Sequence, residues 1–126
     1  MYALKVRGRF AASHVLPGHA GACSRLHGHT WTVAVKVGGA TLDQGGMLLD
    51  FHDLKGALAR VLGTLDHRHL NDLPAFAGAH EPTAENLARH IFRELAGMVP
   101  LTARVLEVEV GESPDSFAYF REGDDF

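Results

Sequence analysis

The sequence has a single cysteine, Cys23, among its 126 residues, so one chain cannot form an internal disulfide. This is typical of proteins that work in the reducing cytoplasm. No apolar run approaches the length of a transmembrane helix, and the first residues lack the apolar core and cleavage site of a signal peptide. We therefore expect a cytoplasmic protein with no membrane partner.

Excess charge of one sign, internal repeats and low-complexity tracts are also missing. The net charge is −3, and 46% of the residues are hydrophobic, which is the composition of an ordinary soluble domain and not of a nucleic-acid-binding protein. The chain also lacks a glycine-rich dinucleotide fingerprint. Residues 1–126 are expected to form one domain, in which any anionic substrate is bound by local positive charge.

Hydrophobic periodicity predicts an α+β fold. Alternating apolar residues predict an antiparallel four-stranded sheet, with strands at 2–14, 29–37, 104–110 and 117–120. Helical spacing predicts one helix from the N-cap Asp50 to about Gly63 and another that begins after Thr83. The segments 16–26 and 64–82 are irregular, and 111–114 is typical of a turn.

Three of the nine histidines have the spacing of metal ligands. His27 and His29 are two residues apart in an extended segment, so their side chains point the same way about 6–7 Å apart. His14 ends another alternating stretch, in phase with its buried positions. A lone histidine on a strand is more often packed or exposed than a ligand, but three nitrogens in phase with no obvious fourth ligand indicate an open, catalytic zinc site. Cupin-type barrels share the His-Gly-His motif, but they expect a later glutamate where this chain has Val33 and Ala34.

Cys23 and the pair Asp66-His67 are candidates for proton transfer. Cys23 precedes the histidine pair, where a cationic neighbour would favour the thiolate, although a lone cysteine is commonly a small buried hydrophobe. Its position leaves three chemical roles open, namely base, nucleophile and zinc ligand. Asp66 either caps the preceding helix or fixes the tautomer of His67 so that the imidazole exchanges protons near neutral pH.

Glu112, Thr83 and Glu85 are weaker candidates for substrate binding. Glu112 is either a solvated turn residue or a carboxylate that takes two parallel hydrogen bonds from an amidine-like N–C–N edge. Thr83 and Glu85 are first of all residues of a helix start, where the dipole favours an acid.

Taken together, these motifs resemble the 6-pyruvoyltetrahydropterin synthase superfamily, and within it the bacterial 6-carboxytetrahydropterin synthases. The resemblance covers nearly the whole chain, in the order of the family. The matching blocks are Phe10-Ala11-Ala12-Ser13-His14, Cys23-Ser24-Arg25-Leu26-His27-Gly28-His29, Gly46-Met47-Leu48-Leu49-Asp50-Phe51, Leu65-Asp66-His67, Leu70-Asn71, Pro82-Thr83-Ala84-Glu85-Asn86 and Gly111-Glu112-Ser113. Two departures are Ser13, where the family often has alanine, and the segment 114–117.

The resemblance implies the tunnelling fold, with two helices on one face of the sheet, and a role for each candidate residue. His14, His27 and His29 would hold zinc. Cys23 would be the catalytic base, and Asp66 with His67 the second proton-transfer unit. Glu112 would anchor a pterin ring, while Thr83 and Glu85 would be further substrate contacts, some of them from a neighbouring subunit of a homo-oligomer, commonly a hexamer. Arg25 and Arg68 are local cations for a triphosphate.

The reaction implied is conversion of 7,8-dihydroneopterin triphosphate to 6-carboxytetrahydropterin, acetaldehyde and triphosphate, in queuosine biosynthesis. Two alternatives use the same scaffold, namely pyruvoyl formation and aldol cleavage of dihydroneopterin. A third is a non-catalytic, zinc-stabilised binding domain, in which Cys23 would close the metal site.

Overall fold

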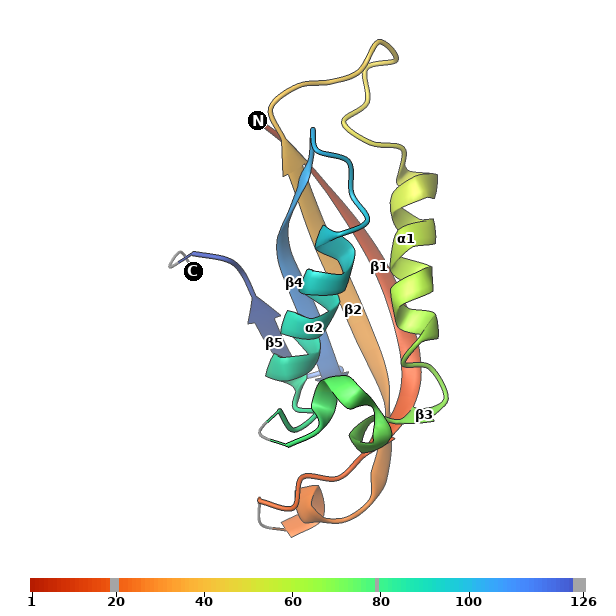
Figure 1. Ribbon diagram of the computed structural model, residues 1–126, viewed down its shortest axis with the longest axis vertical. Coiled ribbons are helices and arrows are strands. Elements are labelled where there is room, and N and C mark those ends of the chain that lie inside the picture. The colour runs from red at the N-terminus through yellow and green to blue at the C-terminus, as the bar shows by residue number, and fades with distance from the viewer. Residues whose placement is uncertain (19–20, 79, 124–126) are drawn as a thin grey trace.

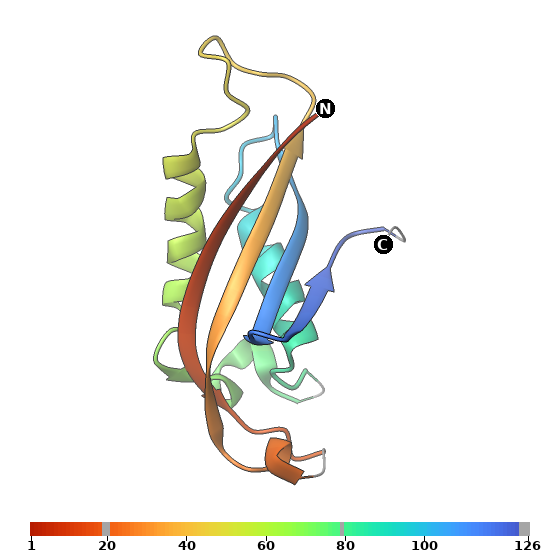
Figure 2. The same ribbon diagram turned by 180° about the vertical axis from the view of Figure 1, so that it is seen from behind.

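The computed structural model describes residues 1–18, 21–78 and 80–123 of the chain. Over these residues, one five-stranded sheet carries two α-helices on one face, and the other face is open (Figures 1 and 2). The strands lie in the order β3-β1-β2-β4-β5. Their bounds are β1 Tyr2–His14, β2 His27–Gly39, β3 Arg68–His69, β4 Arg104–Ser113 and β5 Ser116–Phe120. The predicted α+β class, the mainly antiparallel sheet and the placement of both helices on one face are confirmed.

The long hairpin of β1 and β2 is the part of the sheet that carries the site. Its antiparallel register runs without interruption from Tyr2 opposite Gly39 to His14 opposite His27. Alternate residues, such as Phe10 and Trp31, are buried beneath the helices, whereas Arg7 and Arg9 are exposed on the open face. The period of two therefore directs His14 to the helix-covered side.

Both helices begin where capping residues predict. In α1 (Phe51–Gly63) the carboxylate of Asp50 accepts a hydrogen bond from the His52 N–H, and in α2 (Ala84–Ala96) the Thr83 hydroxyl accepts one from the Asn86 N–H. Neither α-helix of the described chain has the length and apolar character that a bilayer crossing requires. Each helix buries an apolar stripe against the sheet: Leu54, Ala57, Leu58, Val61 and Leu62 from α1, and Leu87, Ala88, Ile91, Phe92 and Leu95 from α2.

A close approach between α1 and β1 depends on Gly8. A Cβ at this position would lie 2.8 Å from Leu62 Cδ1 and 3.3 Å from Leu58 Cδ2. Because no real Cβ tolerates such a distance, a larger residue would push the helix outward. Gly8 thus sets the depth at which α1 packs.

The predicted four strands are too few, because β3 joins the sheet at its edge. This two-residue strand pairs in parallel with β1, with Arg68 opposite Ala12 and His69 opposite Ser13. A strand this short has no alternation for sequence reading to detect. The irregular segments also contain three 3-10 helices, η1 (Gly21–Ser24), η2 (Leu70–Asp72) and η3 (Pro74–Phe76).

The predicted turn at 111–114 was placed too early. β4 continues to Ser113, with an irregularity in its pairing to β5 between Gly111 and Ser113. The irregularity lets the strand continue through a segment whose glycine and proline are typical of a turn. Glu112 consequently lies on a strand.

Candidate active site

Three histidine side chains meet at the end of the β1–β2 hairpin. His14, the last residue of β1, lies opposite His27, and His29 lies opposite Ala12. Residues paired across antiparallel strands project from the same face, so the three imidazoles gather on one side of the sheet. Their ring centroids are 4.4, 4.7 and 5.1 Å apart. The structure thus brings together the three histidines that the spacing singled out.

Backbone carbonyls fix the tautomers of two of these rings. The Nδ1 of His14 lies 2.8 Å from the carbonyl oxygen of Pro82, and the Nδ1 of His27 lies 2.6 Å from that of Arg25. A carbonyl only accepts, so each Nδ1 carries the hydrogen and each Nε2 of a neutral ring has a lone pair. The two Nε2 atoms are 2.8 Å apart. Two facing lone pairs at this distance need a cation between them, which is how protein metal sites orient histidine ligands.

The Nε2 atom of His29 completes this arrangement. It is buried and has no hydrogen-bond partner among the described residues, although Oε1 of Glu112 lies 3.1 Å away. The carboxylate is therefore close enough for charge attraction without the alignment of a hydrogen bond. One ligand atom from each of the residues His14, His27, His29 and Glu112 lies within 4.8 Å of all the others. A buried nitrogen left without a partner fits a site that holds a metal ion.

Burial keeps these rings ready to bind a cation. Desolvation lowers the pKa of His14 and of His29 below the ordinary value of 6.5. Both rings are therefore neutral at neutral pH, which is the form that binds a metal. The cluster has the donor atoms and the protonation states to hold a metal ion.

Asp66 and His67 form a coupled pair on the other side of β1. Asp66 accepts a hydrogen bond of 2.9 Å from the Ala11 N–H, and its second oxygen lies 2.9 Å from Nδ1 of His67. These two contacts, the backbone N–H first, lower the pKa of Asp66. The carboxylate is therefore ionised and holds the hydrogen of His67 on Nδ1, which leaves Nε2 to exchange protons.

The backbone at His67 has the unusual φ of +57°, and its N–H donates to the Ala11 carbonyl over 2.6 Å. This left-handed residue turns the chain from the end of α1 into β3. A non-glycine residue in this conformation costs free energy, and such residues are common at functional sites.

One cavity adjoins both His29 and His67. It has a volume of about 530 Å³ and is lined by Ala11, Ala12, Ser13, Gly28, His29, Thr30, His67, Arg68 and His69. A ligand in this cavity can contact a histidine of the cluster and the exposed ring of His67 together. Arg68, predicted to bind phosphate, also lines it.

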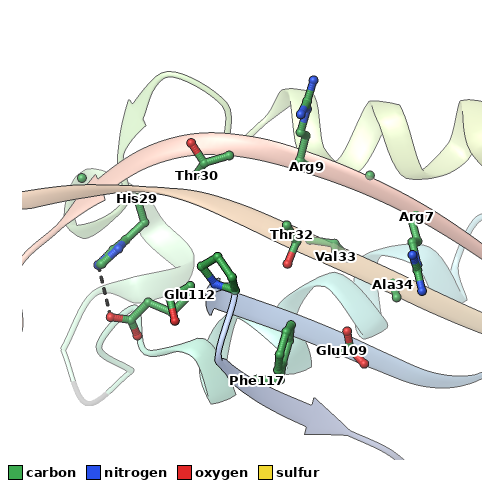
Figure 3. Close-up of a pocket in the computed structure, with 14 residues that line it drawn as sticks. Arg7, Arg9, His29, Thr30, Thr32, Val33, Ala34, Glu109, Glu112 and Phe117 are labelled. Carbon is green, nitrogen blue, oxygen red and sulfur yellow. Dashed lines mark ion pairs between the residues drawn. The ribbon is translucent and has the colours of Figure 1, made fainter.

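A larger cavity of about 930 Å³ lies on the open face of the sheet and adjoins His29 and Glu112. Figure 3 shows the Glu112 carboxylate turned toward His29, with Thr32 and Phe117 along the neighbouring strands. The four-residue cluster is therefore not sealed, because space for a ligand lies beside it.

The remaining predicted residues are less informative. The side chain of Cys23 lies outside the part of the protein that the structure describes. Arg25 is exposed and contacts the site through its carbonyl. Thr83 caps α2, directly after the residue whose carbonyl orients His14, and Glu85 is exposed in the first helical turn.

Sequence reading missed three features of the site. The carbonyls of Arg25 and Pro82 carry no signal, because every residue has one. Trp31 is fully buried, with ring centroids 5.0 Å from His14 and 5.1 Å from His29, and it reads only as an apolar strand residue. The hydrogen bond of 3.0 Å between Ser13 and His69 depends on the unpredicted strand β3.

Comparison with known proteins follows this geometry. Residues 3–123 match the family described as 6-pyruvoyl tetrahydropterin synthase. The chain belongs to this family. A relative in Bacillus subtilis, named 6-carboxy-5,6,7,8-tetrahydropterin synthase, is 36% identical over 118 residues, which cover 88% of this chain and 79% of that protein. The protein of the same name in Haemophilus influenzae is 29% identical, with 97% and 100% covered.

The fold of this family member agrees with solved structures. The structure of Caenorhabditis elegans 6-pyruvoyl tetrahydropterin synthase is similar to it with a TM-score of 0.84 and 27% identity, covering 97% of this chain and 96% of that one. The superfamily and tunnelling fold that the sequence motifs predicted are thereby confirmed.

Proposed function

We propose that this protein is a zinc-dependent carbon–carbon lyase that converts 7,8-dihydroneopterin triphosphate to 6-carboxy-5,6,7,8-tetrahydropterin, with release of acetaldehyde and triphosphate. The observation that carries the proposal is the histidine cluster, in which two Nε2 lone pairs face each other beside a cavity. The names of the bacterial relatives supply the reaction.

His14, His27 and His29 are the proposed zinc ligands. Three neutral imidazoles with an adjoining cavity are the donor set of catalytic zinc sites, whereas structural sites favour four ligands rich in cysteine. The chemistry that zinc supplies at such a site is Lewis-acid polarisation of the substrate's side-chain hydroxyls.

Cys23 is the proposed base that removes a proton from a side-chain carbon of the substrate. His67, held by Asp66, returns or relays protons, and its exposed ring beside the cavity supports this role. Tautomerisation then moves the reducing electrons of the side chain into the pterin ring, so no nicotinamide is needed. Loss of triphosphate and a retro-aldol cleavage complete the reaction.

Glu112 is the proposed anchor of the pterin ring, because its carboxylate can accept two hydrogen bonds from the 2-amino and N3 edge. Its place in the wall of the 930 Å³ cavity supports this role. Arg25 and Arg68 are the proposed contacts of the triphosphate. Thr83 and Glu85 complete the proposed substrate-binding residues.

We further propose that residues 1–126 form a single cytoplasmic domain that assembles as a homo-oligomer, commonly a hexamer in this family, and serves queuosine biosynthesis. Active sites between subunits would explain why the cavities beside His29 are open in one chain.

Product analysis tests the reaction. Purified, zinc-loaded protein is incubated with 7,8-dihydroneopterin triphosphate, and the products are identified by mass. Acetaldehyde and a carboxypterin would support the proposal, whereas a diketo side chain would indicate pyruvoyl formation. An aldol product from dihydroneopterin would indicate the other lyase activity. Zinc binding without any pterin turnover would favour the non-catalytic binding domain.

A further inference from the structure

A separate polar cavity lies along α2 and the segment that precedes it, below and beside that helix in Figure 1. Its volume is about 220 Å³. The residues that line it are Ala75, Phe76, His80, Asn86, Arg89, His90 and Arg93. None of these residues was assigned to the proposed reaction.

The lining of this cavity is basic in a chain whose net charge is −3. Arg89 and Arg93 are one turn apart on α2, and His80 comes from the preceding segment. None of the residues that line this cavity is acidic. Glu94 is near enough to His90 to raise its pKa, but burial outweighs this effect and lowers the pKa of that ring. The cavity therefore offers donors to a ligand and no competing carboxylate of its own.

Arg89 is held in place by its neighbours. Its Nη2 atom donates to Oδ1 of Asn86 and to Nδ1 of His80, each over 3.0 Å. A guanidinium only donates, so Nδ1 of His80 accepts and the hydrogen of its neutral ring is on Nε2. These contacts use Nη2, and they leave Nε and Nη1 of Arg89 and Nε2 of His80 as donors in a preorganised group.

We infer that this cavity binds a phosphate-bearing anion, with Arg89, Arg93 and His80 as its donors. Arginine's planar fork matches two oxygens of a phosphate. The volume of 220 Å³ is below the roughly 300–1,000 Å³ of pockets for whole organic ligands, so it suits a phosphate or the end of a polyphosphate. The buried ring of Phe76, 5.3 Å from that of His90, forms an apolar wall.

The segment before α2 places this cavity next to the proposed active site along the chain. His80 contacts Arg89, whereas two residues later the Pro82 carbonyl accepts from His14. The side chain of Asn86 donates to the Glu81 carbonyl over 2.8 Å and thereby joins the segment to α2. The inference itself does not depend on the proposed reaction.

Anion titration followed by NMR tests the inference. Inorganic phosphate, tripolyphosphate and a phosphate-free pterin are each added to the zinc-loaded protein at constant ionic strength, while the ring signals of His80 and His90 are observed. We expect saturable shifts with phosphate or tripolyphosphate and none with the pterin. A tighter response to tripolyphosphate would identify a polyphosphate as the ligand. Shifts that do not saturate, or that follow the pterin, would overturn the inference.

Variants separate this site from the proposed active site. Arg93→Gln and Arg89→Gln should each weaken anion binding at least tenfold, whereas Arg60→Gln, on the exposed side of α1, should leave it unchanged. Arg68→Gln should also leave the His80 and His90 shifts intact, because Arg68 lines the other cavity. Arg89→Lys keeps the charge without the fork and should bind with intermediate affinity. Equal loss in Arg60→Gln, or no loss in Arg93→Gln, would refute the site even if turnover were normal.

Discussion

At the scale of single residues, the chemistry of this protein depends on which atoms carry hydrogens. Two carbonyls hold the hydrogens of His14 and His27 on Nδ1, and an aspartate does the same for His67. The same tautomer therefore serves two purposes, since it frees Nε2 for a cation in one place and for proton exchange in another.

Cys23 is the residue whose replacement best separates the catalytic role from the ligand role. We predict that Cys23→Ala keeps its zinc and its thermal stability and loses about 10²–10⁴-fold in turnover, the usual contribution of a general base. Metal analysis and steady-state rates on the same preparation measure both. A zinc-free variant would instead make Cys23 a ligand.

Glu112 has two candidate partners, the pterin edge and the histidine cluster. We predict that Glu112→Gln retains zinc and raises the KM for the pterin roughly tenfold to a hundredfold, because hydrogen bonds to a charged group are worth about 1.5–3 kcal/mol. Glu109→Gln, in the wall of the same cavity, is the matched control and should change KM little. Loss of zinc from Glu112→Gln would show that this carboxylate is a fourth ligand.

At the scale of elements, sequence reading succeeded where a signal repeats. The alternation over 2–14 and the capped, periodic helix after Asp50 each span several turns or pleats, so their bounds were close to the structure. β3 failed because two residues repeat nothing and depend on pairing with a strand more than fifty residues away. The histidine cluster was predictable from spacing, whereas its carbonyl partners were not.

The start of α2 both caps a helix and orients a metal ligand, since Thr83 follows Pro82. We predict that Thr83→Ala lowers the free energy of unfolding by about 1 kcal/mol, the usual value of a threonine cap. Urea denaturation measures the change. Thr83→Ser keeps the hydroxyl and should restore most of the stability; an equally unstable serine variant would contradict the capping role.

The connection from α1 to β3 should be sensitive to acid through Asp66. Its folded-state pKa is lowered below the ordinary 3.8, so the ionised group stabilises the fold above about pH 4, and this contribution disappears as the pH falls through the folded pKa. We predict that Asp66→Asn is less stable than the parent at neutral pH and that the difference shrinks below about pH 4. Thermal melts over this range measure it, and a difference independent of pH would show that the charge is unimportant.

At the scale of the whole molecule, the core is independent of the metal site. Twenty-three buried residues form one apolar cluster between the sheet and both helices. We therefore predict that a chelator lowers the melting temperature without unfolding the protein. At a free zinc concentration about 100 times the dissociation constant, bound metal adds roughly 2.7 kcal/mol.

Calorimetry and circular dichroism with and without chelator test this prediction, with zinc re-addition as the control. A chain that unfolds completely without metal would behave like a zinc finger and would support the non-catalytic alternative.

The carbonyls that orient His14 and His27 belong to peptide groups, so Arg25 and Pro82 contribute through the path of the main chain. Evolution is accordingly free to exchange the side chain at position 25 without disturbing the ring beside it. A search for co-varying positions would overlook these supports, and redesign of the metal preference should begin with loop geometry before any change of ligand.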